Sequence, residues 1–350
     1  MDQFVTVRLV QGNSMDLTLF QFDLDLTFAV FFMNADKTIY GRYGTRSDQK
    51  QAMREISIES FGKALRAALD IHKDYPSNKA SLAGKHGPKP RYAKPEQYPD
   101  LKKFKANLDY QGQVSRSCMH CHMIQAAERK AWRSQRKAPP DKVLYPWPMP
   151  DAVGLSLDPK EKAKVAKVAR GSAAEKARFR PRDEILKLNG QPILSIADVQ
   201  WVLHSAEAPA TIEAEVLRSG KTGTLKLALK EDWRRTSSIS WRTSTWDMRR
   251  MALGGMILRD STTEERRKAG LGKGGMALFV KGAGRHGAHR VARNRGFLPN
   301  DIIVDFGGIR DVKNESQLIA ELMRTRMPGE KVPVKIVRGR KQMKLELPMQ

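Results

Sequence analysis

The sequence has 350 residues, with 63 Lys or Arg against 38 Asp or Glu and a formal net charge of +25. This length suits two or three domains, and the 40% hydrophobic and 29% charged residues exclude a disordered tail. No stretch approaches the ~18 consecutive apolar residues of a membrane span, and residues 1–10 lack the pattern of a signal peptide. The basic residues are spread over the whole length without a recognisable nucleic-acid module, so we expect no nucleic-acid partner and no membrane span.

The first 75 residues predict a strand, a hairpin and a helix, in that order. Residues 4–10, FVTVRLV, alternate apolar and polar side chains as a strand does. Two β-rich runs, 28–32 and 38–43, flank a turn and predict an antiparallel hairpin. Apolar residues then recur at helical spacing, which predicts an amphipathic helix over about 57–73.

Residues 76–150 are rich in Pro and Lys and are expected to form a linker that carries the only two cysteines, Cys118 and Cys121. Two cysteines exclude a disulfide framework. With His122 they form Cys-x-x-Cys-His, the attachment pattern of c-type haem. On a helix the thiols fall on one face, where each can add to a haem vinyl while His122 ligates the iron. Met149, held between two prolines, is the candidate sixth ligand, ahead of Met123 and His86.

Two other interpretations of the cysteines stay open. The first is a redox dithiol without metal, in which the neighbouring Arg116 and Arg129 lower a thiol pKa. The second is a zinc site built from Cys118, Cys121 and one or both of His120 and His122, although no second ligand pair follows at finger spacing.

The C-terminal half contains an internal repeat of roughly 90 residues, which is the length of a domain rather than a solenoid unit. Residues 153–230 and 255–347 share one order: an apolar loop, a short helix, a strand, a tight turn, a second helix and a closing hairpin. Both copies resemble PDZ domains of the kind found in bacterial envelope proteases. The residues that carry the resemblance are Gly154, Leu155, Ser156, Leu157, Ala177, Phe179, Asp183, Ile185, Asn189 and Gly190 in the first copy, and Gly255, Met256, Ile257, Leu258, Phe297, Asp301, Ile303, Gly307 and Gly308 in the second.

The PDZ resemblance implies binding of protein or peptide C-termini. Loops 154–157 and 255–258 would hold the carboxylate while the peptide pairs with an open strand edge. The alternative is that either copy is a spacer. The sequence departs from the family where glycines are usual, with Arg178 and Arg182 in the first copy and Asn300 in the second. A positive φ is expected there, which is costly for Arg.

The whole chain resembles a family of bacterial thioredoxin-like/PDZ (seleno)proteins. The resemblance rests on DLTFAVFFMNADKTIYGRYGTR (25–46), CMHCH (118–122), YPWPMPDAVGLSLDP (145–159), SIADVQWVLH (195–204) and WRTSTWDMRRMALGG (241–255). It implies that the N-terminal part is the second half of a thioredoxin fold without its redox motif. It also implies that Met1 follows a selenocysteine codon and is not the true start.

The expected fold class is α+β multidomain, with a partial thioredoxin-like domain followed by two PDZ-like β-rich domains. The expected boundaries are 1–75 for the thioredoxin-like part, 76–150 for the linker with Cys-x-x-Cys-His, 151–232 for the first PDZ-like domain, 233–253 for a second linker and 254–350 for the second PDZ-like domain.

The expected function is that of a periplasmic or otherwise extracytoplasmic, redox-associated protein with peptide-binding modules, covalent haem c and a redox partner. No complete catalytic site is recognisable in the sequence. The alternatives are a non-catalytic PDZ scaffold and a thiol or selenol oxidoreductase whose active half lies outside this chain.

Overall fold

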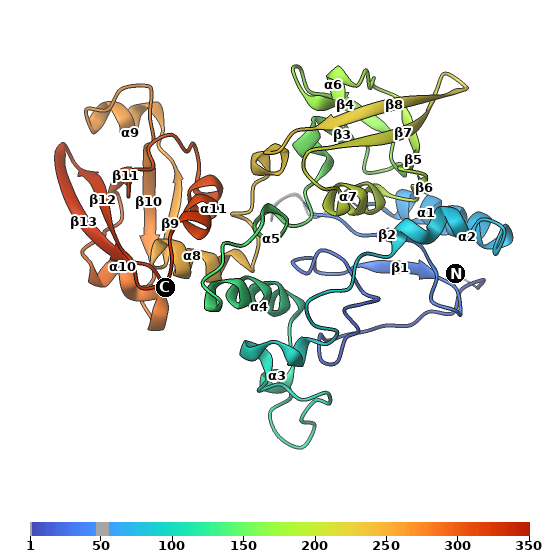
Figure 1. Ribbon diagram of the computed structural model, residues 1–350, viewed down its shortest axis with the longest axis horizontal. Helices are drawn as coiled ribbons and strands as arrows, with labels where there is room; N and C mark the ends of the chain where they lie inside the picture. Colours follow the sequence, from blue (N-terminus) through green and yellow to red (C-terminus); the bar gives the residue numbers. More distant parts are fainter. Residues whose placement is uncertain (1, 47–55) are drawn as a thin grey trace. The chain divides into compact units, whose positions relative to one another are not determined.

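The computed structural model describes residues 2–46 and 56–350, so Met1, which was expected not to be the true start, lies outside the described residues. The chain divides into two compact units, each described here by itself (Figure 1). Unit 1 contains Met1–Ile124 and Tyr145–Ser237, and unit 2 contains Gln125–Leu144 and Ser238–Gln350. Among the described residues, no helix has the length and apolar character needed to cross a membrane.

The predicted N-terminal hairpin and helix are confirmed. Strands β1 (Val30–Met33) and β2 (Ile39–Tyr43) pair antiparallel, and helix α1 (Ile58–Lys73) follows. The helix begins after Ser57, whose hydroxyl accepts a hydrogen bond from the Ser60 N–H at 3.0 Å and so satisfies one of the free donors of the first turn. A hairpin followed by a helix is a common arrangement, so the thioredoxin-like assignment stays a prediction.

The prediction of a strand over residues 4–10 is wrong. This segment has no regular secondary structure, and Val5 and Val7 are 95% and 79% exposed. An isolated strand leaves its backbone N–H and C=O groups without ladder partners, and no described strand pairs with this segment. The alternation of apolar and polar residues predicted a strand, but no described strand lies beside residues 4–10 to pair with it.

The C-terminal part of unit 1 has the element order that the repeat predicts. Its elements are η4 (Pro150–Val153), β3 (Leu155–Leu157), β4 (Val165–Val168), α6 (Ala173–Lys176), β5 (Glu184–Leu188), β6 (Gln191–Pro192), α7 (Ile196–Ser205), β7 (Ala210–Arg218), β8 (Lys221–Leu229) and η5 (Trp233–Thr236). The strands form a four-stranded sheet in the order β6-β5-β7-β8 and a separate pair, β3-β4. One apolar core joins these elements, with Phe179, Ile185 and Val199 at its centre.

The expected linker, residues 76–150, is folded into short helices with buried side chains and is not an extended chain. It carries the short elements α2 (Lys79–Leu82), η1 (Ala83–Lys85), η2 (Pro95–Gln97), η3 (Pro99–Leu101), α3 (Val114–Ser117), α4 (Cys121–Ser134) and α5 (Asp141–Leu144). Tyr98, Leu101 and Phe104 are buried. The Pro- and Lys-rich composition suggested a linker, but apolar residues at irregular spacing anchor it.

The C-terminal part of unit 2, residues 238–350, repeats the element order of β3 to β8. Its elements are α8 (Thr245–Leu253), β9 (Met256–Asp260), α9 (Thr263–Lys268), β10 (Leu278–Ala283), η6 (Gly287–Arg290), α10 (Val291–Asn294), β11 (Ile302–Phe306), α11 (Glu315–Thr325), β12 (Lys331–Arg338) and β13 (Lys341–Pro348). The five strands form one sheet in the order β13-β12-β11-β10-β9, which places β9 at an edge. Helix α8 falls in the expected second linker, yet Met248, Met251 and Leu253 on it are buried.

The two units also repeat one ion pair between a buried aspartate and a half-buried arginine. In unit 1 Asp183 accepts two hydrogen bonds from Arg218, each 2.7 Å long, and in unit 2 Asp301 accepts two from Arg338 at 2.7 and 2.9 Å. Each arginine also donates to a backbone carbonyl, of Arg178 in unit 1 and of Gly296 in unit 2. The shared contact shows that the sequence repeat is a structural repeat.

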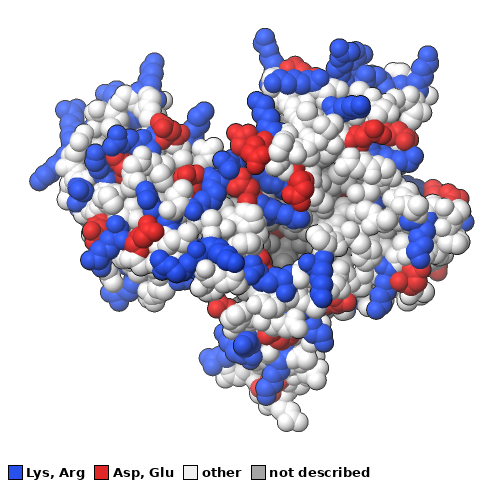
Figure 2. All heavy atoms as spheres, viewed as in Figure 1, with Lys and Arg blue, Asp and Glu red and all other residues white. Residues whose placement is uncertain are grey.

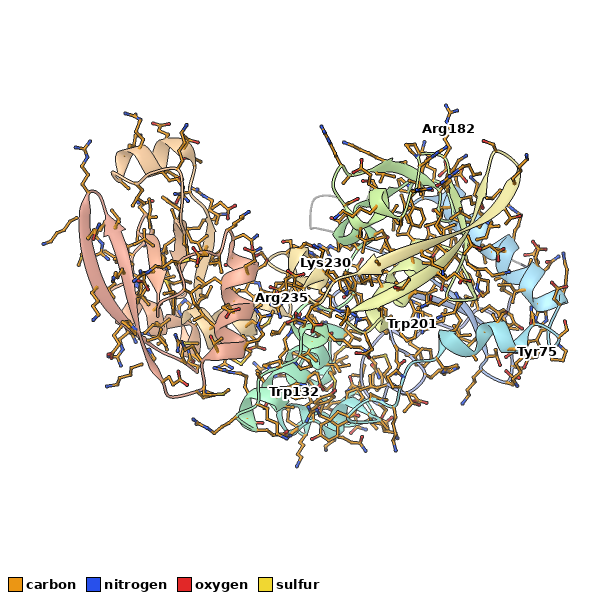
Figure 3. The ribbon with its side chains drawn as sticks, turned by 45° about the horizontal axis from the view of Figure 1, so that its top comes forward. Tyr75, Trp132, Arg182, Trp201, Lys230 and Arg235 are labelled. Atoms are coloured by element: carbon orange, nitrogen blue, oxygen red, sulfur yellow. The ribbon has the colours of Figure 1, made fainter. Side chains whose placement is uncertain are left out.

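The three residues that replace glycines all have positive φ, as predicted: 66° at Arg178, 75° at Arg182 and 73° at Asn300. The side chain of Arg182 points into solvent (Figure 3). The left-handed conformation costs an L-residue roughly 1–2 kcal/mol. Glycine avoids this cost because it has no Cβ, but its backbone loses more conformational entropy on folding.

We therefore expect Arg182→Gly to raise the free energy of unfolding by about 0.5–1 kcal/mol. Arg180 is also exposed but does not have positive φ, so Arg180→Gly is the matched control and should lower it by about the same amount. Urea unfolding followed by tryptophan fluorescence measures both. Equal effects of the two substitutions would contradict the account of the backbone at Arg182.

The charge is distributed rather than concentrated. Figure 2 shows Lys and Arg side chains scattered over the visible face, with Asp and Glu side chains among them. This distribution agrees with a solvated surface.

Candidate peptide-binding site

The loop before β3 is shaped by Gly154. Its φ is 88°, and a Cβ at this position would lie 2.2 Å from Cβ of Ser172, so only glycine fits. The Gly154 N–H donates to the carbonyl of Asp151 at 2.9 Å. This loop was expected to offer its N–H groups to a peptide carboxylate, and the structure shows that the N–H of Gly154 is already engaged within η4.

Strand β3 offers one side to a further strand. In the described part of the chain β3 pairs only with β4, through Leu155 with Val168 and Ser156 with Lys167. Leu155 is buried in the core, whereas Ser156 is exposed. An edge strand of this kind is the element to which an extended peptide can add.

Helix α7 is covered on nearly all sides, because Ile196 to Leu203 are buried. The segment just before η4 lies on its C-terminal half. The Trp147 indole stacks on His204 at 4.2 Å between ring centroids, and the Trp147 carbonyl accepts from Gln200 Nε2 at 2.7 Å. Trp147 has a φ of 51°, a conformation that is costly for a bulky residue and that these contacts offset. The side of α7 that carries Gln200 and His204 is therefore occupied by the chain itself.

The N-terminal half of α7 holds a buried polar cluster. The Asp198 carboxylate lies 2.8 Å from Lys85 Nζ, both side chains being 0% exposed, and accepts from the backbone N–H groups of Arg42 and Leu194. The Arg42 guanidinium lies 3.9 Å from the ring centroid of Trp201, a buried side chain that is labelled in Figure 3. Burial lowers the pKa of Lys85 and lowers that of Arg42 to about 10, against the opposing effect of Asp198. This cluster ties β2 and the 76–150 segment to α7, and sequence reasoning missed it.

The second predicted loop is buried except at Ile257. Gly255 has a φ of 89°, and its N–H donates to the carbonyl of Arg249 in α8. Met256 and Leu258 are buried, and Ile257 is half-buried. The Leu258 N–H donates to the carboxylate of Glu315, the first residue of α11. In both units, then, the N–H of the loop glycine, Gly154 or Gly255, donates to a carbonyl of the preceding helix.

The Cys-x-x-Cys-His segment differs from the helix that was expected. Helix α4 begins at Cys121, while Cys118 precedes it with extended backbone (ψ 123°), so the two thiols do not share a helical face. Met119 between them is fully buried, its N–H donating to Asn13 at 2.7 Å and its carbonyl accepting from Gly12 at 2.8 Å. Both cysteines are half-buried and neither forms a disulfide. The ring of His122 stacks on that of His120 at 5.8 Å.

Met149 lies against α7, where its sulfur accepts from Gln200 Nε2 at 3.5 Å. Its role as an iron ligand, like that of His122, rests on the motif alone. No group of three or more His, Cys, Asp or Glu side chains suited to a metal ion occurs in residues 2–46 and 56–350. Covalent haem stays a prediction. A chain exported with a c-type maturation system should keep a haemochrome spectrum after denaturation and lose it in Cys118→Ala, and a colourless denatured chain would contradict it.

The expected lowering of a thiol pKa by basic neighbours is wrong for Cys121. Burial raises the pKa of the Cys121 thiol, and the nearby Cys118 adds to the effect. The side chain of Arg129 donates to Val143 and Ser244. The raised pKa disfavours the thiolate, the form that acts as nucleophile.

We expect iodoacetamide to label Cys121 in the folded, haem-free Cys118→Ala chain more slowly than in the urea-unfolded chain at pH 8. The reason is that a higher pKa leaves less thiolate at any pH below it, so the rate should rise at higher pH in the folded chain than in the unfolded one. Mass spectrometry of quenched samples measures both rates. Faster labelling of the folded chain at pH 8 would show an activated thiol and support the redox dithiol.

Comparison with known proteins assigns the first domain. The PDZ domain family model matches residues 151–229. This part of the chain is a PDZ domain. The PDZ match spans β3 to β8 and includes the Gly154 loop and α7. It confirms the resemblance for the first copy.

Among curated proteins, the chain is 26% identical over 187 residues to a probable periplasmic serine endoprotease DegP-like of Marinomonas sp. (strain MWYL1). The aligned region is 53% of this chain and 37% of that protein, so the chain spans only about a third of its relative. Solved structures of the HtrA-type protease AlgW with a decapeptide and with a tripeptide match 40% of this chain each. They cover 49% and 53% of those chains, with identities of 16% and 15% and TM-scores of 0.25 and 0.24.

Proposed function

We propose that this chain is an extracytoplasmic protein-interaction factor whose PDZ domain binds extended peptides ending in a free carboxylate. The observation that carries the proposal is the β3 edge, which lies within the matched PDZ residues and has one side without a strand partner among the described strands. A peptide pairing there would gain main-chain hydrogen bonds without unfolding the domain. The DegP-like relative is described as a periplasmic protease, which supports an extracytoplasmic location for this chain.

A peptide at this edge would meet the segment that already lies on α7. Trp147 and Met149 occupy the side of Gln200, so the bound peptide either displaces this segment or contacts β3 alone. Displacement would cost part of the stacking of Trp147 on His204, and the affinity of a single peptide would fall accordingly.

The test compares two forms of one labelled seven-residue peptide that ends in Val, one with a free C-terminal carboxylate and one amidated. We expect the amidated peptide to bind at least tenfold more weakly in fluorescence anisotropy, because a buried carboxylate site discriminates by charge and hydrogen bonding. Equal binding of the two forms would overturn the proposal.

A substitution in the protein tests whether the peptide binds at β3. Ser156 is exposed on β3, so Ser156→Glu should fold normally and weaken the free-acid peptide several-fold through like-charge repulsion. Ser156→Gln has nearly the same shape without the charge and should bind as the unaltered chain does. If Glu and Gln had the same effect, the peptide would bind elsewhere.

The redox role and the haem have no support beyond the Cys-x-x-Cys-His pattern, and they are not needed for this proposal. The thioredoxin-like assignment of the N-terminal part likewise adds nothing to it, because the structure shows only that β2 of the hairpin packs against α7 and that α1 packs against β2.

A further inference from the structure

Strand β9 of unit 2 has an outer edge that is closed. Among the described strands β9 pairs only with β10, where Leu258 lies opposite Val280. The Leu258 N–H donates instead to Oε1 of Glu315 at 2.8 Å. In an antiparallel pair the N–H and C=O of one residue point to the same side, so both groups of Leu258 face away from β10. The donor that an added strand would need is therefore taken by a carboxylate of α11.

That carboxylate is held by a cation from α8. Arg249 donates from Nε to Oε1 at 2.9 Å and from Nη2 to Oε2 at 2.6 Å, a two-point contact between side chains only 6% and 3% exposed. Arg249 Nη2 also donates to the Ser240 carbonyl at 2.6 Å. A buried carboxylate is strongly unfavourable without such a partner, so Arg249 stabilises Glu315 where it is.

Helix α8 lies on both β9 and α11, which also contact each other. It packs against α11 and against β9, and the three elements lie together in Figure 1. The chain just before α8 adds two contacts to the start of α11: the Ile239 N–H donates to Ser316 Oγ at 3.0 Å, and the Ser240 hydroxyl lies 3.0 Å from the same atom. The segment 239–253 thus lies against both β9 and α11, the elements of unit 2 that correspond to β3 and α7 of unit 1.

We propose that the space between β9 and α11 is a second peptide-binding groove, that α8 is its built-in occupant, and that Glu315 selects occupants carrying a basic side chain. Any segment that replaces α8 must supply a cation to the buried Glu315 carboxylate, because an unpaired carboxylate there is costly. The chain therefore keeps this groove closed until α8 is displaced by a peptide with Arg or Lys at the matching place. The proposal concerns unit 2 alone and does not depend on peptide binding by residues 151–229.

The test uses the occupant itself as the probe. A labelled synthetic peptide of residues 243–253, TSTWDMRRMAL, is added to the full chain and to its Arg249→Gln variant. In the unaltered chain the tethered α8 competes at high effective concentration, so the peptide should bind weakly. We expect Arg249→Gln to bind it at least tenfold more tightly, and to reject the same peptide with Gln in place of Arg249.

Two matched variants control for charge and position. Arg249→Lys keeps a cation and should stay closed, and Arg250→Gln removes a cation that pairs with Asp247 on the surface of α8 and should also stay closed. Equal binding by the unaltered chain and Arg249→Gln, or binding indifferent to Arg in the peptide, would overturn the proposal.

Amide hydrogen exchange separates opening of α8 from unfolding. In Arg249→Gln the Leu258 amide should exchange at least tenfold faster, while the buried amide of Val334 in the same sheet should keep its protection. Persistent protection of Leu258 would overturn the proposal. Should Arg249→Gln unfold unit 2, the double variant Arg249→Gln/Glu315→Gln removes both buried charges. It is expected to fold and to bind the Arg and Gln peptides alike, and a preference for Arg would contradict the role of Glu315.

Discussion

Replacing Asp198 by Asn is expected to lower the free energy of unfolding of unit 1 by about 3–5 kcal/mol. The substitution keeps the shape of the side chain but leaves the Lys85 ammonium, 0% exposed, without its counter-charge. Lys85 also donates to the Pro192 carbonyl, which satisfies one N–H but does not neutralise the charge. The loss of unfolding free energy in Asp198→Asn therefore measures the cost of a buried charge without a partner.

Two controls define the effect of Asp198→Asn. The pair of Lys187 and Glu215 has the similar distance of 3.0 Å but is 45% and 36% exposed, so Glu215→Gln should cost less than about 1 kcal/mol. The double variant Lys85→Met/Asp198→Asn removes both charges and should recover most of the lost stability. Urea unfolding followed by the fluorescence of unit 1 tryptophans is the measurement. A loss below about 1 kcal/mol for Asp198→Asn would show that the cluster is hydrated rather than buried.

The second large effect is expected at Gly255. A Cβ added there would lie 1.9 Å from the carbonyl oxygen of His289, which is backbone and has little freedom to move. The left-handed φ adds roughly 1–2 kcal/mol and the overlap a further ~1–3 kcal/mol, so Gly255→Ala should destabilise unit 2 by about 2–5 kcal/mol.

Gly275→Ala is the matched control for Gly255→Ala. Gly275 has a φ of 72°, but a Cβ there would meet nothing within 4 Å, so only the conformational cost of about 1–2 kcal/mol applies. Chemical denaturation monitored by circular dichroism compares the two. If both substitutions lowered the free energy of unfolding by the same amount, the close approach of Gly255 to the His289 carbonyl would be contradicted.

The repeat and the first PDZ domain could be predicted because their signals are local. The Asn189–Gly190 turn, the apolar alternation of β7 and the buried Asp183 before β5 lie close together in the sequence, and each has a direct structural reason. The positive φ values at Arg178 and Arg182 followed from the same local pattern, because the chain path at that turn fixes the backbone whatever residue stands there.

The occupied grooves could not be predicted from the sequence. Nothing near Glu315 indicates that its partner is Arg249, and nothing near Asp198 indicates Lys85, since each pair joins segments far apart in the chain. The same limit explains the error at residues 4–10, where alternation predicts a strand but the existence of a pairing neighbour decides. A Cys-x-x-Cys-His pattern likewise fixes residue types, while its surroundings decide the chemistry.

The most direct test of the account is to find where a free-acid peptide contacts the chain. A peptide ending in Val and carrying a photo-crosslinker near its C-terminus is irradiated with the full chain, and the labelled residues are identified by proteolysis and mass spectrometry. The account predicts labelling within β3 and its preceding loop, loss of labelling with the amidated peptide, and no labelling of β9 in the unaltered chain. Labelling of β9 with α8 in place, or equal labelling by the amidated peptide, would contradict it.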